Sequence, residues 1–254
     1  MFEGIMKEAE LLLGFAAVAV IWLVMIAMDV WRRAKGLKRR TTSPMRQWFA
    51  SIGILWGLAA ISVWAWMASG RTLADLGFSS GEAGGWRLGL AWGLAIAFAG
   101  QQVIQLIAIR RNEETRTQVK DVVFGSGDYD QIMPRRRKDV WGYQLLAVTA
   151  GITEEVVFRA FLISLFALWM PIWLAAVAAL AMFIVAHAYQ GVQGLVRILP
   201  VSIVLTLCYV LSGSLWPGIF LHVAVDVLSG LMVWVILPRE GYVEVQPRTE
   251  GAPA

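Results

Sequence analysis

The chain has 254 residues, of which 58% are hydrophobic and only 16% are charged. Soluble domains carry about 25% charged residues, so the composition excludes an ordinary soluble domain and indicates membrane helices. The single cysteine excludes an intramolecular disulfide framework and any paired-cysteine metal motif. The net charge of +4 comes from short basic clusters between apolar stretches, a pattern typical of topology signals and not of a nucleic-acid surface.

Seven apolar stretches are long enough to span, or nearly span, a bilayer. They are residues 9–28, 48–69, 86–109, 141–168, 171–189, 195–211 and 215–237. We predict an all-α fold, a polytopic integral membrane helix bundle of about seven (seven to eight) transmembrane helices. The first stretch is longer than a signal-peptide core and lacks a small-residue cleavage site, so we expect it to remain in the membrane. Pro200 and Pro217 are placed to start helices below the membrane surface.

The basic clusters predict the orientation of the helices. Between the first two stretches lie Arg32, Arg33, Lys35, Lys38, Arg39, Arg40 and Arg46, without an acidic residue. Short basic loops stay in the cytoplasm, and Arg110, Arg111 and the run 135–138 mark a second such loop. We therefore expect the N-terminus outside and the C-terminus in the cytoplasm, with the charges of residues 110–138 facing solvent and lipid headgroups.

The predicted organisation has four parts. Residues 1–110 form about three N-terminal transmembrane helices, 111–139 a charged cytoplasmic connector, 140–237 a core of about four transmembrane helices, and 238–254 a disordered tail. The connector is broken at residues 125–128 and could be helical on either side of the break. Glycine pairs spaced by four residues, at 53 and 57 and at 89 and 93, would let helices approach closely.

Three ionisable residues interrupt the fourth apolar stretch. A charge at the membrane centre costs at least about 2.5 kcal/mol, so Glu154 and Glu155 need a reason to be there. At 100° per residue, Glu155 and Arg159 lie one turn apart on one helix face and can neutralise each other. Glu154 is rotated away from Arg159 and has no local cation. We therefore expect Glu154 to face a cavity, water or another helix, although a purely structural ion network of the three residues fits this motif equally well.

Both histidines of the chain also lie in predicted membrane helices. Phe183 and His187 share a helix face in the fifth stretch, and His222 and Asp226 share one in the seventh. Together with Glu154, these groups can activate water and stabilise an oxyanion. Glu154, His187 and His222 could equally hold a zinc ion, since zinc accepts histidine nitrogen and carboxylate oxygen.

These residues resemble the three motifs of the CPBP family. The motifs are Glu154-Glu155-x-x-x-Arg159, Phe183-x-x-x-His187 and His222-x-x-x-Asp226, in this order on separate helices between residues 140 and 237. That family includes CAAX prenyl endopeptidases of the Rce1 type and bacterial bacteriocin-processing, immunity or abortive-infection proteins. The segment from Thr72 to Phe78 resembles a short element often found ahead of the core in bacterial members.

The resemblance implies an intramembrane endopeptidase, usually labelled a metalloprotease. Glu154 would be the base that takes a proton from water, His187 would position the water, and His222 with Asp226 would stabilise the oxyanion or bind the substrate carbonyl. Glu155, Arg159 and Phe183 would support them. Many members carry asparagine where this chain has Asp226, and an ionised aspartate cannot donate a hydrogen bond. Asp226 could instead orient His222 and stabilise its cationic form, or ligate a metal.

Several alternatives stay open at this stage. The substrate implied by the resemblance is a peptide or a prenylated protein at the lipid bilayer, and the protein would sit in a bacterial inner (plasma) membrane. A noncatalytic immunity or scaffold protein could use the same polar cluster structurally. A proton-coupled carrier is disfavoured because we find no internal repeat. Counting residues from the predicted helix ends places Glu154 at mid-membrane, His187 near the cytoplasmic edge and His222 toward the outer edge, whereas one site requires them level.

Overall fold

The structure is a computed structural model that describes residues 2–34, 43–79, 85–125 and 132–243. Within these ranges it consists of helices and connecting turns, without a strand, as predicted. The long helices are α1 (Phe2–Ala34), α2 (Met45–Ala68), α3 (Trp86–Arg111), α4 (Glu113–Gly125), α5 (Val140–Glu154), α7 (Ile172–Ala186), α8 (Gly191–Ser212) and α9 (Trp216–Ile236). Shorter elements are η1 (Ala74–Leu76), η3 (Arg137–Asp139), η4 (Glu155–Ile163), α6 (Ser164–Phe166) and η5 (Ala188–Gln190).

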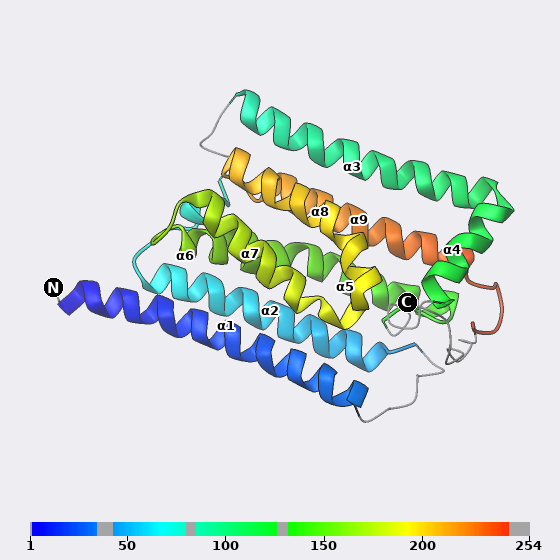
Figure 1. Cartoon of the computed structure of the whole chain (residues 1–254), viewed down its shortest axis with the longest axis horizontal. Helices are drawn as coiled ribbons and strands as arrows, with labels where there is room; N and C mark the ends of the chain where they lie inside the picture. The colour runs from blue at the N-terminus through cyan, green and yellow to red at the C-terminus, as the bar shows by residue number, and fades with distance from the viewer. Residues whose placement is uncertain (1, 35–42, 80–84, 126–131, 244–254) are drawn as a thin grey trace.

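The helices lie lengthwise beside one another in an elongated bundle (Figure 1). Helices α1, α2, α3, α9 and the α8 segment are long and apolar enough to cross a membrane. Helix α7 is shorter, and the fourth predicted stretch, residues 141–168, is divided among α5, η4 and α6. Each of the seven predicted stretches thus coincides with helix, and the protein is an integral membrane protein.

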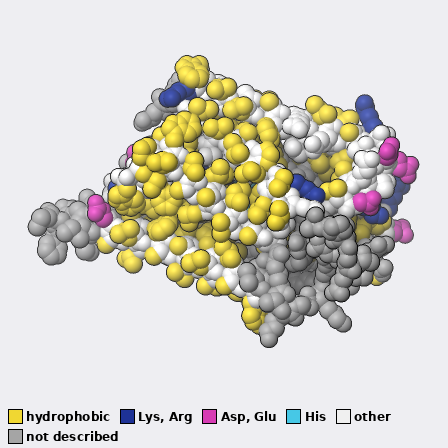
Figure 2. All heavy atoms as spheres, in the orientation of Figure 1, with side chains coloured by type: hydrophobic (Ala, Val, Ile, Leu, Met, Phe, Trp, Pro, Cys, Tyr) yellow, Lys and Arg dark blue, Asp and Glu magenta, His cyan; other side chains and the backbone are white. Residues whose placement is uncertain are grey.

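Hydrophobic side chains cover most of the face shown in Figure 2. The acidic groups on this face, and most of the basic ones, gather toward the two ends of the molecule. An apolar belt between polar ends matches a bilayer, whose hydrocarbon layer is about 30 Å thick.

The segment from α5 through η4 to α6 is one continuous helix with a change of hydrogen-bond pattern in its middle. From Glu155 to Ile163 the turns are π-helical, so each turn holds more residues than the uniform α-helix that the sequence predicted. The side chains of this π-helical segment are all buried. Such wide turns often occur at functional sites, and here the change begins at Glu155, the residue after Glu154.

Helix α7 is the short element of the core. It begins after Pro171 and ends at His187, which caps it, and the chain reverses through η5 to Gly191, whose φ of +70° suits a glycine. Pro217 stands at the start of α9, as predicted. Pro200 does not start a helix, because it lies inside α8, and the prediction for it was wrong. The first turns of α8 run across the neighbouring helices, as a proline-bent helix can (Figure 1).

A loop between α2 and α3 holds the start of α9. The backbone N–H of Leu215 donates to the Gly77 carbonyl, and the Trp216 indole donates to the Phe78 carbonyl. Within the loop, the Thr72 N–H and hydroxyl donate to the Asp75 carboxylate, and the backbone donor in particular lowers the pKa of Asp75. The segment that resembled a family element thus anchors the helix that carries His222.

Basic residues of the connector are built into the opposite end of the bundle. Arg135 is 3% exposed, and the Arg137 guanidinium donates to the Leu237 and Val235 carbonyls at the end of α9 while stacking on the Trp234 ring. These two arginines therefore do not face lipid headgroups, and the expectation from the sequence was wrong for them. Arg137 instead satisfies carbonyls that a helix end leaves without partners.

Part of the connector and tail lies outside the described residues. Helix α4 ends at Gly125, where the sequence placed a break, but residues 126–131 beyond it are not described. Val243, in the predicted disordered tail, is buried and its N–H donates to the Arg135 carbonyl. Residues 244–254 and 35–42, which include most of the first basic loop, also lie outside the described ranges.

The Gly77 turn offers a test of the loop that anchors α9. Gly77 has a φ of +79°, and a Cβ there would lie 2.9 Å from the Gly213 carbonyl oxygen and from Tyr209. We expect Gly77→Ala to lower the free energy of unfolding by about 2 kcal/mol or more, because left-handed backbone strain alone costs roughly 1–2 kcal/mol. Gly213→Ala is the matched control, since its φ is +63° but the space around it is open. Thermal unfolding in detergent should show a larger loss for Gly77→Ala, and equal losses would contradict the tight contact.

Candidate functional site

The structure gathers Glu154, His187 and His222 inside the bundle. The Glu154 Oε2 atom lies 3.7 Å from His187 Nε2 and 3.8 Å from His222 Nε2. The three residues come from the end of α5, the end of α7 and the first half of α9. One carboxylate oxygen therefore faces two imidazole nitrogens, as the sequence motifs predicted for residues that act together.

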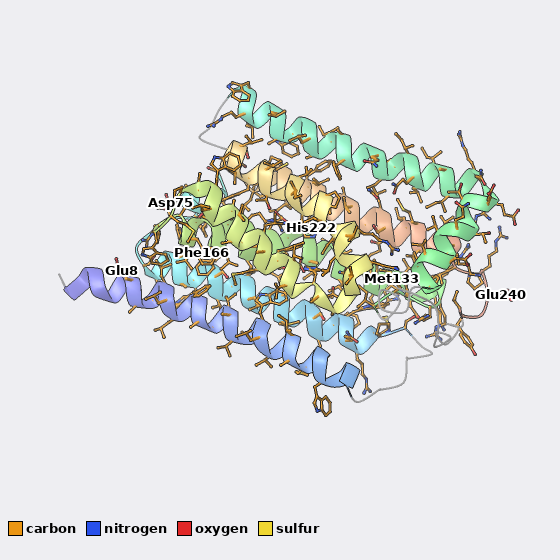
Figure 3. All side chains as sticks on the ribbon, in the orientation of Figure 1. Glu8, Asp75, Met133, Phe166, His222 and Glu240 are labelled. Atoms are coloured by element: carbon orange, nitrogen blue, oxygen red, sulfur yellow. The ribbon has the colours of Figure 1, made fainter. Side chains whose placement is uncertain are left out.

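Asp226 forms the open side of this group. Its Oδ2 atom lies 3.7 Å from His222 Nε2, one helical turn along α9. The Asp226 side chain is 31% exposed, whereas those of Glu154 and His222 are each 9% exposed. In Figure 3, His222 lies between Asp75 at one end of the bundle and Glu240 at the other. The candidate site is thus enclosed at mid-bundle, and its access is on the Asp226 side.

A second set of contacts holds the site from behind. The Arg159 guanidinium donates to Glu155 Oε1 at 2.8 Å, and His222 Nδ1 lies 2.8 Å from the same oxygen. Both Glu155 and Arg159 have side chains that are 1% exposed. The predicted pairing of Glu155 with Arg159 is therefore present, and the π-helical turn does not break it. The contact of Glu155 with His222 was not predicted, because it joins residues far apart in the sequence.

Phe183 connects the two histidines and the arginine. Its backbone carbonyl accepts a hydrogen bond from His187 Nδ1 at 2.8 Å, and its ring stacks on the His187 ring. The guanidinium of Arg159, a residue of η4, lies 4.3 Å from the ring centroid of Phe183 on α7. Since the Nδ1 atoms of both histidines are held, their Nε2 atoms are directed at Glu154.

The helix boundaries explain why the depths deduced from the sequence were wrong. The predicted fifth stretch ran to residue 189, but α7 ends at Ala186 and the chain turns back at His187. His187 therefore lies level with Glu154 and His222 instead of at the membrane edge, as their contacts require. A short helix, which length counting treats as a full span, accounts for the difference.

Two further residues shape the site, and sequence patterns did not reveal them. A Cβ at Gly218 would lie 2.9 Å from Glu155 Oε2, so a larger residue there would displace this carboxylate. The Ser202 carbonyl on α8 accepts a hydrogen bond from Arg159. Both lie on other helices than Glu155, and one glycine or serine in an apolar stretch carries no signal of such a role.

The spacing of the predicted zinc ligands does not fit a zinc site. Zinc bonds of about 2.0–2.1 Å in a tetrahedral site place neighbouring ligand atoms about 3.4 Å apart. The Glu154 oxygen lies farther than that from both histidine nitrogens, at 3.7 and 3.8 Å. No group of three or more His, Cys, Asp or Glu side chains in the described ranges is arranged to hold a metal ion. We therefore derive no reaction step through a metal at Glu154, His187 and His222.

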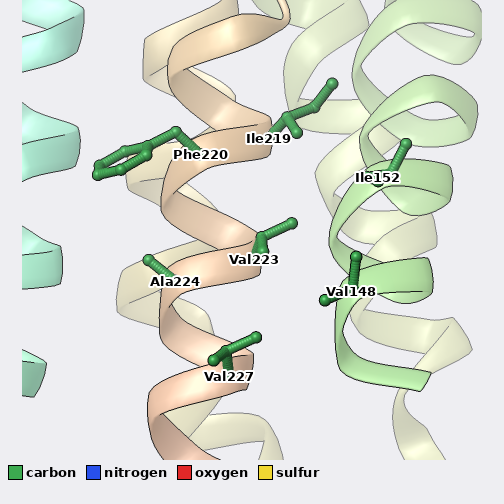
Figure 4. Close-up of a pocket in the computed structure, with 7 residues that line it drawn as sticks. All are labelled: Val148, Ile152, Ile219, Phe220, Val223, Ala224 and Val227. Atoms are coloured by element: carbon green, nitrogen blue, oxygen red, sulfur yellow. The ribbon is translucent and has the colours of Figure 1, made fainter. Parts of the chain in front are cut away.

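An apolar groove lies beside the site but is not part of it. It has a volume of about 470 Å³ and runs along the seam of α5 and α9 (Figure 4). Its lining consists of Val148, Ile152, Ile219, Phe220, Val223, Ala224 and Val227. All of these side chains are apolar and none is ionisable, so the groove offers no polar side chain to a reaction.

The fold and these contacts define an all-helical membrane protein with a glutamate and two histidines gathered inside the bundle. Residues 136–228 match the family model described as type II CAAX prenyl endopeptidase, Rce1-like. The chain therefore carries an Rce1-like domain, and all three motifs that suggested the resemblance lie within it. A search of curated proteins gave no match, and a search of solved structures gave none either.

Glu154 and Glu155 have different surroundings, so replacing each with alanine should change the stability of the protein differently. Glu155→Ala leaves the buried Arg159 without its carboxylate, and breaking a buried ion pair in this way costs on the order of 3–5 kcal/mol. Glu154 has no ion pair or hydrogen bond shorter than 3.7 Å among the described residues, so Glu154→Ala should be neutral or stabilising. Thermal unfolding of the two purified variants measures this. Equal destabilisation would mean that Glu154 also holds the fold together.

Proposed function

We propose that the protein is an intramembrane endopeptidase in which Glu154 activates the attacking water. One observation carries the proposal: a single Glu154 oxygen faces the Nε2 atoms of two histidines whose other ring nitrogens are fixed. Fixed orientation is what a general base and its partners need. The match of residues 136–228 to an Rce1-like endopeptidase model supports a CAAX-type protease.

The first chemical step uses Glu154 and His187. A water molecule between Glu154 and the histidines gives a proton to the Glu154 carboxylate as its oxygen attacks the carbonyl carbon of the peptide bond. His187 Nε2 accepts the second hydrogen of this water and so fixes its direction, because the Phe183 carbonyl holds the Nδ1–H of the same ring. The result is a tetrahedral intermediate with a negatively charged oxygen.

The second step uses His222. An N–H at His222 Nε2 donates to the oxyanion, while Glu155 accepts from Nδ1 and holds the ring in place. The proton on Glu154 then passes to the leaving amine as the carbon–nitrogen bond breaks, which restores the carboxylate. These two N–H groups require the cationic form of His222, and the partly exposed carboxylate of Asp226, 3.7 Å from Nε2, stabilises that form.

The substrate class follows from the place of the site. The Glu154, His187 and His222 side chains are buried within an apolar bundle, so the peptide bond has to reach membrane depth. We propose a membrane-associated substrate, either a prenylated C-terminal peptide or a leader peptide, with the enzyme in a bacterial inner membrane, its N-terminus outside and its C-terminus in the cytoplasm.

A noncatalytic scaffold is the competing function. The bonds of Glu155 to Arg159 and His222 would serve it equally well, since they connect η4 and α9. The surroundings of Glu154 favour the protease. Burying a carboxylate costs desolvation energy, and no hydrogen bond or short ion pair of Glu154 among the described residues stabilises a scaffold in compensation.

Cleavage by the Glu154 variant decides between these functions. We expect purified protein in detergent to cut members of a peptide library that includes farnesylated C-terminal peptides. Glu154→Gln should slow cleavage at least about 100-fold, the usual contribution of a general base, with unfolding unchanged. Mass spectrometry of the products measures both rates. Full activity in a folded Glu154→Gln variant would remove Glu154 from the mechanism.

A chelator tests the metal label of the resemblance separately. Because the described donor groups do not have metal spacing, we expect cleavage by the wild type to be unchanged after dialysis against a strong zinc chelator. Loss of cleavage on chelation, with recovery on adding zinc, would show that a metal takes part and that the site rearranges to hold it.

A further inference from the structure

Three glutamines interrupt the apolar sequence of α3 and have no part in the proposed reaction. Gln101 and Gln105 are exposed, and Gln102 is half-buried. At ~1.5 Å per residue, Gln101 lies ~22 Å from Trp86 and ~14 Å from Arg110, within the hydrocarbon layer. None of the three amides has a hydrogen bond within the part of the chain that the structure describes.

An amide without a partner is unfavourable in hydrocarbon. Water cannot satisfy it there, and membrane helices normally bond such side chains across helix interfaces. The glutamines also give α3 a mean hydropathy of 1.5, the lowest of the five candidate spans. The exposed amides therefore indicate that this side of α3 meets another polar surface in the membrane.

The helix surface around the glutamines is shaped for close approach. Gln101 and Gln105 continue a row of every fourth residue that begins with Gly89, Gly93 and Ala97, which we call the α3 ridge. A Cβ at Gly89 or Gly93 would meet nothing within 4 Å.

The rest of the bundle leaves the α3 ridge uncovered. The buried side of α3 is a different row, formed by Ala91, Ala95 and Ala99 against α8 and α9. Only 17% of the apolar window of α3 is buried, and the helix lies at one edge of the bundle (Figure 1).

We propose that the α3 ridge binds the same ridge of a second copy of this chain. An amide donates and accepts, so Gln101 can pair with the second copy's Gln101 across a two-fold axis. A copy inserted with the same topology places this amide at the same membrane depth, which an unrelated helix would match only by chance. The glycine pair on α2 is open as well, but no exposed glutamine pair continues its row, and we assign no partner there.

Cysteine cross-linking in native membranes tests the dimer without any assay of cleavage. Ala97→Cys should form a disulfide-linked dimer on mild oxidation, since Ala97 is exposed at the centre of the α3 ridge. Val103→Cys is the control, because it is 42% exposed on α3 but lies roughly 120° around the helix from Ala97. The natural Cys208 is buried and should give no cross-link.

Glutamine variants test whether cross-linking depends on the amide hydrogen bond or results from chance collisions between copies. In the Ala97→Cys background, Gln101→Leu keeps the side-chain size but removes the amide, and we expect ~10-fold less cross-linked dimer, the effect of one interhelical amide bond. Gln101→Asn should keep part of it. Equal cross-linking at residues 97 and 103, or dimer unchanged by Gln101→Leu, would overturn the proposal. So would a purified wild type that is monomeric by mass measurement in lipid nanodiscs, since the amides would then need another partner.

Discussion

The Glu155 carboxylate is the group on which the arrangement of the core depends. One of its oxygens accepts from Arg159 on its own helix and lies at bonding distance from His222 on α9. In a nonpolar interior these three groups tolerate burial only together, because each alone carries the cost of desolvation. Gly218 and the Ser202 carbonyl give the network room and a further acceptor. The network fixes the imidazole of His222, and the Glu154 carboxylate lies 3.8 Å from the Nε2 atom of that ring.

Two neighbouring glutamates thus have opposite situations. Glu155 is removed from solvent and one of its oxygens contacts both Arg159 and His222, while Glu154 has, among the described residues, only imidazole nitrogens beyond hydrogen-bond distance. A structural residue and a residue free to react can therefore stand side by side in one short motif.

Much of this was accessible from the sequence, and the remainder has a physical reason. The apolar stretches predicted the helices because bilayer thickness fixes their length, and the spacing of Glu155 and Arg159 predicted their pairing because it lies within one turn. The end of α7 was missed, since an apolar stretch does not show where the chain turns back. The contacts of Glu155 with His222 and Gly218 were missed because they depend on how α9 packs against η4, which no local pattern encodes. The burial of Arg135 and the contacts of Arg137 with the end of α9 were missed because basic residues next to a membrane usually face water.

The pairing of Glu155 with Arg159 also bears on how the protein enters the membrane during synthesis. The pair is local, so it can form as soon as this stretch becomes helical, before α7, α8 and α9 have left the ribosome. At that moment the insertion machinery receives a segment in which two of its three charges already cancel, and only Glu154 opposes transfer into lipid. His222 lies on α9 and is synthesised last, when the Glu155 oxygen that it contacts is already in place. The order of residues along the chain thus lets a polar centre be assembled within the bilayer one helix at a time.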